Sequence, residues 1–477
     1  MKRVRNKIPI AIGRLLGLLL FPAIVFAQTD TAKITRHEFT IQQAVDYAIK
    51  NNVNVKNALL GVKSQEQVNR EVTARAYPGI NASLGTTYNP NVATQVLPNF
   101  ISPATYQVLI DQGVKDGSGN PIVMPSDFGF ISAQFGTKFT ANAGISLSQI
   151  LFDGQVFVGL MARKATMQFA QKNVEITEEA IKTNIYKVYY QLVVSKTQVE
   201  LLDTNIAFVE KNLRDTRIIY ENGFREQLDV DKVSVLLTNL QTEKRKVLNI
   251  ISNGYYGLKM LIGMPVADEL VLTDKITDSE IKEGILEAST YTYENRKEFQ
   301  YAQIAKQLNE YNVRRYELSQ IPTVALTGQY AKSAQRNKWN FFGKGDWFTI
   351  SNVNLNVSIP IFNGFYTKSK IEQAKIEVRK VDNQLEALKL SIDGEVAMAK
   401  NNFSSAIATM DFQKKNMQLA ENIYQQTKKK YEVGLGSQLE INAAQTDMKT
   451  AQTNYITALY DAIIAKVDFM KATGKLQ

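Results

Sequence analysis

The 477-residue sequence contains no cysteine and a single histidine, His37. Without thiols, the chain can form no disulfide and no thiolate metal site. One histidine supplies neither a zinc ligand set nor a histidine-based catalytic triad. The carboxylates are spread along helical stretches without a paired-acid motif. We therefore expect no catalytic residues, no metal and no cofactor, and we expect a protein that is not an enzyme.

Long apolar runs are scarce as well. After residue 27 no run reaches the roughly eighteen apolar residues that a transmembrane helix requires. Residues 1–27 have the pattern of a secretory signal peptide, with five basic residues, an apolar run over 15–26 and Ala27 at the expected cleavage site. An N-terminal anchor is the alternative, but the run is too short for one.

Removing these five cations from the net charge of +10 leaves +5, and nothing then indicates nucleic-acid binding.

The remaining chain contains two similar halves. The stretch "LFDG" at 151–154 matches "IFNG" at 361–364, and "YENGFREQLDV" at 220–230 matches "YEVGLGSQLEI" at 431–441. The nearly constant offset indicates a duplicated unit. We expect a first repeat over 28–265, an inter-repeat equatorial segment over 266–288 and a second repeat over 289–477. Each repeat should contain an opening helix, a β-hairpin, a long helix, a tip turn and a returning helix.

The β-hairpins are expected over 79–152 and 322–362. Within them, apolar residues alternate with Asn, Ser, Thr and Gly over 80–88, 139–147, 323–330 and 352–359. A face of small uncharged polar residues opposite an apolar face suits a barrel wall with lipid outside and water inside. The longer loop of the first hairpin, 90–137, would then lie outside the cell.

The helices are expected to form an elongated column. The long helices, about 155–220 and 365–427, would measure about 100 Å at 1.5 Å per residue, and the first keeps apolar heptads typical of coiled coils. The opening helices, 41–77 and 289–320, and the returning helices, 228–262 and 439–473, are about half as long. We expect one opening helix and one returning helix to stack end to end along each long helix. The strands would then lie at one end of the column and the glycine turns at the other.

Four strands cannot close a barrel, so several chains must share one, and three copies would supply twelve strands. In their order, these motifs resemble the TolC-like outer-membrane efflux proteins. The resemblance rests on "FTIQQAVDYAIKNNVNVKNA", "ARAYPGI" with "LSQIPTV", "LFDG" with "IFNG", "VYYQLVVS", the two glycine turns, and "LKMLIG" with "KATG". It implies an α+β membrane protein: a homotrimer whose twelve-stranded outer-membrane β-barrel continues into a long α-helical coiled-coil tunnel in the periplasm. Many members have Asn-Pro where this chain has Asn52-Val53 and Asn295-Arg296.

The resemblance also implies a function and partners. The chain would be the outer-membrane exit channel of a tripartite efflux or type I secretion system, in a Gram-negative bacterium. A periplasmic membrane-fusion adaptor and an inner-membrane pump of the RND or ABC type would open its periplasmic tip, and outer-membrane lipid would surround the barrel. The alternative is a trimeric coiled-coil structural or adhesive surface protein with a small anchoring barrel.

Site residues follow from the turns and the second hairpin loop. Gly223 and Gly434 are expected to cap the long helices, and the resemblance adds adaptor contact at Gly223, Phe224, Val433, Gly434 and Leu435. It implies a gate at Asp229, Glu440 and Tyr431, although both acids would also stabilise helix N-termini. Arg225 would substitute for the arginine that the family carries at Gly436. The aromatic residues of the second loop predict either an interfacial girdle or a small loop core: Trp339, Phe341, Phe342, Trp347 and Phe348.

Overall fold

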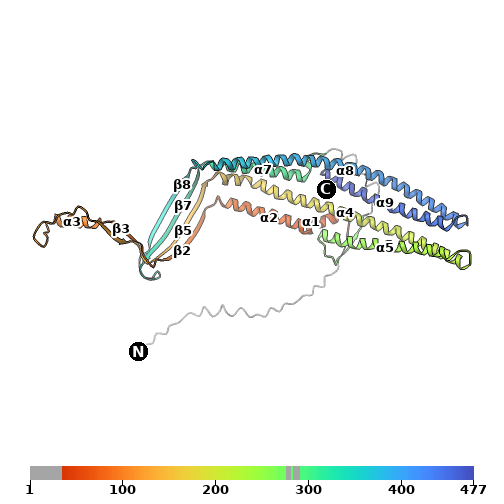
Figure 1. Ribbon diagram of the computed structural model, residues 1–477, viewed down its shortest axis with the longest axis horizontal. Coiled ribbons are helices and arrows are strands. Elements are labelled where there is room, and N and C mark those ends of the chain that lie inside the picture. The colour runs from red at the N-terminus through yellow and green to blue at the C-terminus, as the bar shows by residue number, and fades with distance from the viewer. Residues whose placement is uncertain (1–34, 275–280, 283–290, 477) are drawn as a thin grey trace, which may run out of the picture.

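The computed structural model describes residues 35–274, 281–282 and 291–476. The expected signal peptide and most of 275–288 lie outside the described residues. Figure 1 shows an elongated molecule in which a helical column joins a four-stranded sheet, and an arm projects beyond the sheet. Among the described helices, none has a stretch long and apolar enough to cross a membrane.

The first half of the chain begins with a broken opening helix. Asn52 has extended backbone angles, ends one helix and caps the next, because its side chain accepts hydrogen bonds from the N–H groups of Asn54 and Val55. The expectation of one continuous helix over 41–77 is therefore wrong. The elements of this half are β1 (Arg36–Phe39), α1 (Ile41–Asn51), α2 (Val53–Ala74), β2 (Gly79–Tyr88), β3 (Thr94–Pro98), α3 (Ile101–Asp111), β4 (Phe130–Gln134), β5 (Phe139–Phe152), α4 (Gly154–Glu221), α5 (Gln227–Ile262) and β6 (Glu269–Leu272).

The second half has the same order of main elements. They are the 3-10 turn η2 (Tyr293–Asn295), α7 (Lys297–Glu317), the 3-10 turn η3 (Leu318–Gln320), β7 (Thr323–Arg336), β8 (Phe348–Ser358), α8 (Tyr366–Glu432) and α9 (Gln438–Ala472). The described part of the opening helix is shorter than the expected 289–320. The other helices lie within a few residues of the expected bounds.

The main sheet is antiparallel in the order β2-β5-β7-β8. Residues that pair directly across such a sheet share a face, so the register decides what each face displays. One row across the four strands is Ile80, Leu147, Gly328 and Val353, and the adjacent row on the other face is Asn81, Ser146, Gln329 and Asn352. The sheet thus has an apolar face and a polar face, as the alternation predicted. Within the described chain, β2 and β8 each leave one edge unpaired.

The long loop of the first hairpin has structure of its own. β3 and β4 form an antiparallel ribbon that carries α3 between them, and this is the arm that projects beyond the sheet in Figure 1. The sequence did not predict these elements, because their five-residue strands are short and far apart in the chain.

The helical column has the expected stacking. α4 contacts α2 and then α5, and α8 contacts α7 and then α9. The predicted heptads of α4 bury Leu202 and Val209 against α5, where they meet Val233, Leu240 and Val247. The α4–α5 seam is therefore apolar.

One returning helix ends against the break between α1 and α2, and the other ends against the start of α7. A β-carbon at Gly263 would lie 2.5 Å from the Asn51 carbonyl oxygen, and one at Gly474 would lie 2.7 Å from the Asn295 carbonyl oxygen. Asn51 and Asn295 therefore occupy equivalent positions in the two halves of the chain. The sequence comparison, which matched Asn52-Val53 with Asn295-Arg296, was one residue out of register.

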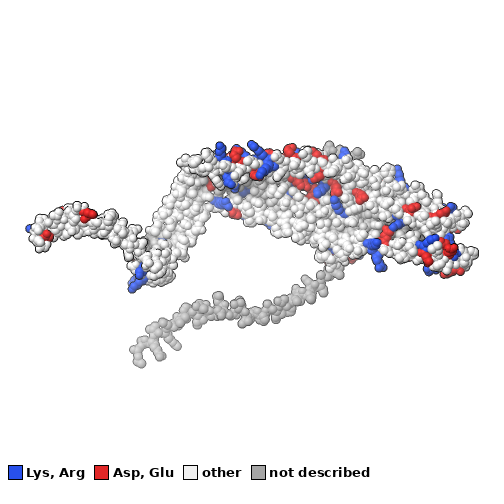
Figure 2. Space-filling model, viewed as in Figure 1, with Lys and Arg blue, Asp and Glu red and all other residues white. Residues whose placement is uncertain are grey.

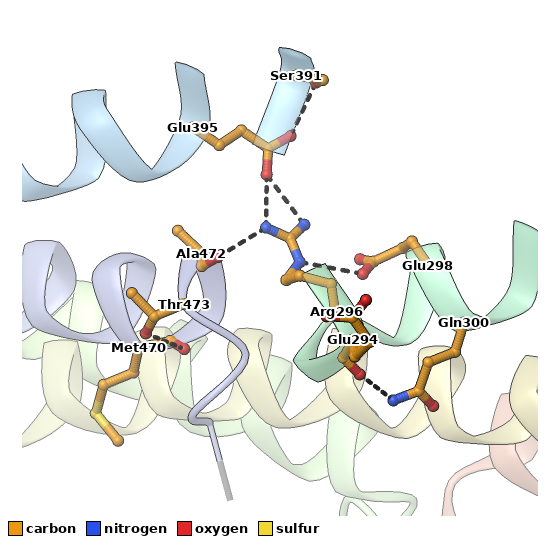
Figure 3. Close-up of polar contacts among 9 residues, drawn as sticks. All are labelled: Glu294, Arg296, Glu298, Gln300, Ser391, Glu395, Met470, Ala472 and Thr473. Carbon is orange, nitrogen blue, oxygen red and sulfur yellow. Dashed lines mark hydrogen bonds and ion pairs between the residues drawn. The ribbon is translucent and has the colours of Figure 1, made fainter. Parts of the chain in front are cut away.

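The residues that follow these asparagines, Asn52 and Arg296, each donate a hydrogen bond to the last turn of a returning helix. Asn52 Nδ2 donates to the Leu261 carbonyl at 2.6 Å, and Arg296 Nη1 donates to the Ala472 carbonyl at 3.0 Å. In the second half the junction is also ionic (Figure 3). Both terminal nitrogens of Arg296 lie 3.0 Å from Glu395 Oε2 of α8, and Nε lies 3.3 Å from Glu298 of α7. Burial opposes the charge on Arg296, but these two carboxylates outweigh it and raise its pKa. One buried side chain therefore joins three helices.

Candidate functional site

Two glycine turns form the end of the column far from the sheet (Figure 1). Gly223 and Gly434 have φ of 80° and 78°, a conformation that disfavours residues with a β-carbon. The next N–H in each turn, of Phe224 and Leu435, donates back to the final turn of the long helix at 3.1 and 2.9 Å. This is the Schellman arrangement, so both glycines cap long helices as expected.

The turns expose apolar side chains. Phe224, Val433 and Leu435 are 82%, 69% and 75% exposed. Gly223 and Gly434 have open space around the position that a β-carbon would take. The tip therefore offers apolar surface and accessible backbone, and adaptor contact at these residues stays a prediction.

Arg225 links the two turns within one chain. Its guanidinium carbon lies 5.0 Å from the centroid of the Tyr431 ring, and its Nη1 lies 3.7 Å from Asp229 Oδ2. The side chains of Arg225 and Asp229 are 19% and 28% exposed, so water screens them less than it screens a fully exposed pair. The structure thus brings together three of the four residues assigned to the gate.

Gln438 completes this cluster, and the sequence analysis missed it. Its Oε1 accepts from three donors: Arg225 Nη1 at 3.1 Å, Thr216 Oγ1 at 3.4 Å and the Tyr431 hydroxyl. Gln438 is only 5% exposed. A signal was present, because Gln227 holds the matching place in the first turn motif. There, however, the amide reaches only Asp231 on the exposed surface.

Glu440 lies apart from this cluster. Its carboxylate accepts from the Ser437 N–H at 3.3 Å, and Ser437 Oγ accepts from the Glu440 N–H at 3.2 Å, which makes a capping box. Lys430 Nζ lies 3.4 Å from the same carboxylate. Within one chain Glu440 therefore caps α9, and its role in the gate stays a prediction.

The seam between α4 and α9, which joins the two helical hairpins, carries many polar groups. Asn205 Nδ2 donates to Gln452 Oε1 at 2.8 Å, and Thr216 donates to Gln438. Three polar atoms of this region are buried without a hydrogen-bond partner among the described residues: Asn205 Oδ1, Asn212 Nδ2 and Gln445 Nε2. Because unsatisfied buried groups cost free energy, these three groups lower the stability of this seam.

The aromatic residues of the second loop divide between a small core and the surface. Trp339 and Trp347 contact Phe341 with ring centroids 5.2 and 6.3 Å away, and Phe341 is buried. Phe342 is 97% exposed. Phe348 pairs with Ser333 on the polar face of the sheet. An interfacial girdle stays a prediction.

The described residues were expected to hold no metal ion. In the described ranges, no group of three or more His, Asp or Glu side chains is placed to hold a metal ion. His37 lies on β1, with Nε2 3.4 Å from Asp268 Oδ2.

Comparisons with known proteins show what the chain is similar to. Residues 291–475 match the family model described as outer membrane efflux protein. TolC of Vibrio cholerae is 21% identical over 339 residues, which cover 70% of this chain and 77% of TolC. TtgC of Pseudomonas putida, a probable efflux pump outer membrane protein, is 19% identical over 444 residues, or 92% of this chain and 83% of TtgC. The second half of the chain thus matches the outer membrane efflux protein family, and outer-membrane efflux proteins resemble the chain over most of its length.

Solved structures of the same family share the fold. The crystal structure of CusC matches with a TM-score of 0.70 at 14% identity, covering 91% of this chain and 92% of that chain. The CmeC outer membrane channel of Campylobacter jejuni matches with a TM-score of 0.68 at 16% identity, covering 91% and 85%. By its similarity to outer membrane proteins, this protein is assigned to the outer membrane of a Gram-negative bacterium, with its helices extending into the periplasm. Its relatives are channel proteins rather than enzymes.

Proposed function

We propose that this protein is the outer-membrane exit channel of a tripartite efflux or type I secretion system. It is a passive homotrimeric conduit without catalytic activity. A periplasmic membrane-fusion adaptor and an inner-membrane pump of the RND or ABC type open its tip, and the pump supplies the energy.

The four-stranded sheet is the observation that best supports this proposal. Its two edge strands are unpaired within the described chain, and open edges are not tolerated in lipid. Three copies joined edge to edge give a closed twelve-stranded barrel, with the apolar face toward lipid and the Asn, Ser and Thr face toward a wet lumen. α4 has 68 residues and extends for about 100 Å, enough for a long periplasmic tunnel below the barrel.

Ion conduction tests the proposal against its alternative. Purified protein in a planar bilayer should give single-channel currents, whereas a coiled-coil structural or adhesive protein with a small anchoring barrel should give none. The turns favour the channel, because both long helices reverse direction at the tip and a fibre requires helices that continue. A preparation that inserts as trimers and never conducts would eliminate the channel.

The gate is proposed to include a ring of three Glu440 carboxylates, one from each chain. Such a ring favours cations and is blocked by polyvalent ones. Glu440→Gln should therefore raise the concentration of a trivalent cation that blocks half the current. Glu226→Gln is the matched control, since Glu226 is an exposed acid of the other turn. Equal block in wild type and Glu440→Gln would exclude the ring.

The substrate class has two candidates, small-molecule or metal efflux and type I protein export, which use the same conduit chemistry. The neighbouring genes distinguish them. An adaptor gene beside a proton-driven pump would indicate efflux, and one beside an ATP-driven exporter would indicate protein secretion.

A further inference from the structure

Charged residues are almost absent from the main sheet. β2, β5 and β8 contain none, and β7 contains two, Lys332 and Arg336. Lys332 pairs with Ala143 in the register, and Arg336 pairs with Phe139. Both positions belong to the apolar face, close to the end of the sheet that is remote from the helices. The proposed lipid-facing wall is thus uncharged except for two cations in the part of β7 that is remote from the helices.

Three further lysines lie at the same end of the sheet. Lys138 immediately precedes β5, and Lys338 and Lys344 lie in the loop between β7 and β8. With Lys332 they are exposed, and none of the four forms an ion pair with another described residue. Figure 2 shows Lys and Arg side chains gathered at this end of the sheet. The loop carries one acid, Asp346, so the charge of the patch is clearly positive.

Arg336 holds the loop that carries two of these lysines. Its Nη1 donates to the Lys344 carbonyl at 3.0 Å, and its guanidinium carbon lies 5.9 Å from the centroid of Phe341. Its Nε and Nη2 are buried without a hydrogen-bond partner among the described residues. Arg336 therefore positions the loop, and the exposed lysines supply the cationic groups that an anionic oxygen can reach.

Aromatic rings lie beside the cations. Tyr88 stacks on Phe139 with centroids 4.8 Å apart, and Trp339, which is 55% exposed, meets Phe139 edge-on at 5.9 Å. Aromatic residues favour the boundary between lipid tails and water. Lysine stems lie along apolar surface while their ammonium groups reach the headgroup level.

We propose that this patch, Lys138, Lys332, Lys338 and Lys344 with Trp339, in a loop held by Arg336, binds the phosphate groups of a phosphorylated lipid in the outer leaflet. The inference rests on the proposed membrane placement of the sheet. Lipid tails contact the uncharged apolar face, the rings lie at the interface, and the lysines meet the phosphates. Phosphate binds such cations through charge-assisted hydrogen bonds.

The two tryptophans of the whole chain, Trp339 and Trp347, both lie in this loop, so intrinsic fluorescence reports on the site. Full-length protein in neutral detergent is titrated with lipid A, and the emission shift gives a half-saturating concentration. Dephosphorylated lipid A, which retains the acyl chains, should require a far higher concentration. Each lysine near a lipid headgroup is worth about a fivefold change in affinity. The change Lys138→Gln/Lys332→Gln/Lys338→Gln/Lys344→Gln should therefore weaken binding by about several hundredfold.

A matched control removes the same charge from the helices. Lys56→Gln/Lys63→Gln/Lys211→Gln/Lys400→Gln alters four exposed lysines that form no ion pair with another described residue, and this variant should bind lipid A as wild type does. The proposal is overturned if lipid A with and without phosphate bind equally to wild type, a comparison that needs no variant. It is also overturned if the patch variant binds normally or if inorganic phosphate alone reproduces the shift. Loss of conduction with normal lipid binding would instead count against the channel.

Discussion

Replacing Arg296 by methionine tests the ionic junction at the middle of the column. The change removes two contacts to Glu395, one to Glu298 and the donor to the Ala472 carbonyl. Breaking a fully buried ion pair costs about 3 to 5 kcal/mol. The side chains of Glu298 and Glu395 are 34% and 47% exposed, so water compensates part of the loss. We expect the free energy of unfolding to fall by about 2 kcal/mol.

Urea unfolding of detergent-solubilised protein, followed by helical circular dichroism at fixed protein concentration, measures this loss. Glu386→Gln on α8 is the control, because its pair with Lys389 is an exposed surface contact worth less than about 0.5 kcal/mol. Adding Glu298→Gln and Glu395→Gln to Arg296→Met should restore part of the stability, since no carboxylate is then left uncompensated. If Arg296→Met unfolds at the same urea concentration as Glu386→Gln, the junction does not stabilise the fold.

Three further predictions concern the tip and the column. Gln438→Leu removes the shared acceptor of the tip cluster and should raise the conductance of the resting channel; an unchanged conductance would refute a closing role. Burial and the nearby Glu298 raise the pKa of Glu179 above its usual 4.5, so the folded chain holds that proton more tightly than the unfolded chain, and stability falls as pH rises through the folded pKa. Glu179→Gln should therefore be more stable than wild type at neutral pH, with a difference that disappears below pH 4.5; a constant difference in urea midpoint would contradict this. Gly434→Val should abolish efflux while trimers still reach the membrane, whereas Gly257→Ala, inside α5 with open space around it, should not.

The main elements of this fold are predictable because their patterns are long. Heptads over dozens of residues specify α4, and strict alternation specifies both faces of the sheet. The break at Asn52 depends on the hydrogen bonds of one side chain, which no periodicity reveals. The arm of β3, α3 and β4 lacks a sustained pattern and was missed.

The site was predictable only where it repeats. The two turn glycines could be predicted because the turn motif occurs twice in the sequence. The same repeat shows that Glu440 in the second motif holds the place of Asp229 in the first. The importance of Gln438 depends on Thr216 and Arg225, residues 222 and 213 positions away in the chain. Contacts of that sequence separation arise from the packing of the two helical hairpins, which a single sequence does not specify.

The exchange of Arg225 for Gly436 between the turns has a steric cause. A β-carbon at Gly436 would lie 3.1 Å from the Tyr431 nitrogen and 3.2 Å from its α-carbon, so the second turn has little room for a side chain there. The cation is supplied by the first turn instead, where Arg225 reaches Tyr431 and Gln438. Arg225→Gly should therefore raise the resting conductance, and adding Gly436→Arg should not restore it. Full restoration in a bilayer recording would mean that the second turn accommodates an arginine, and that the two positions are interchangeable.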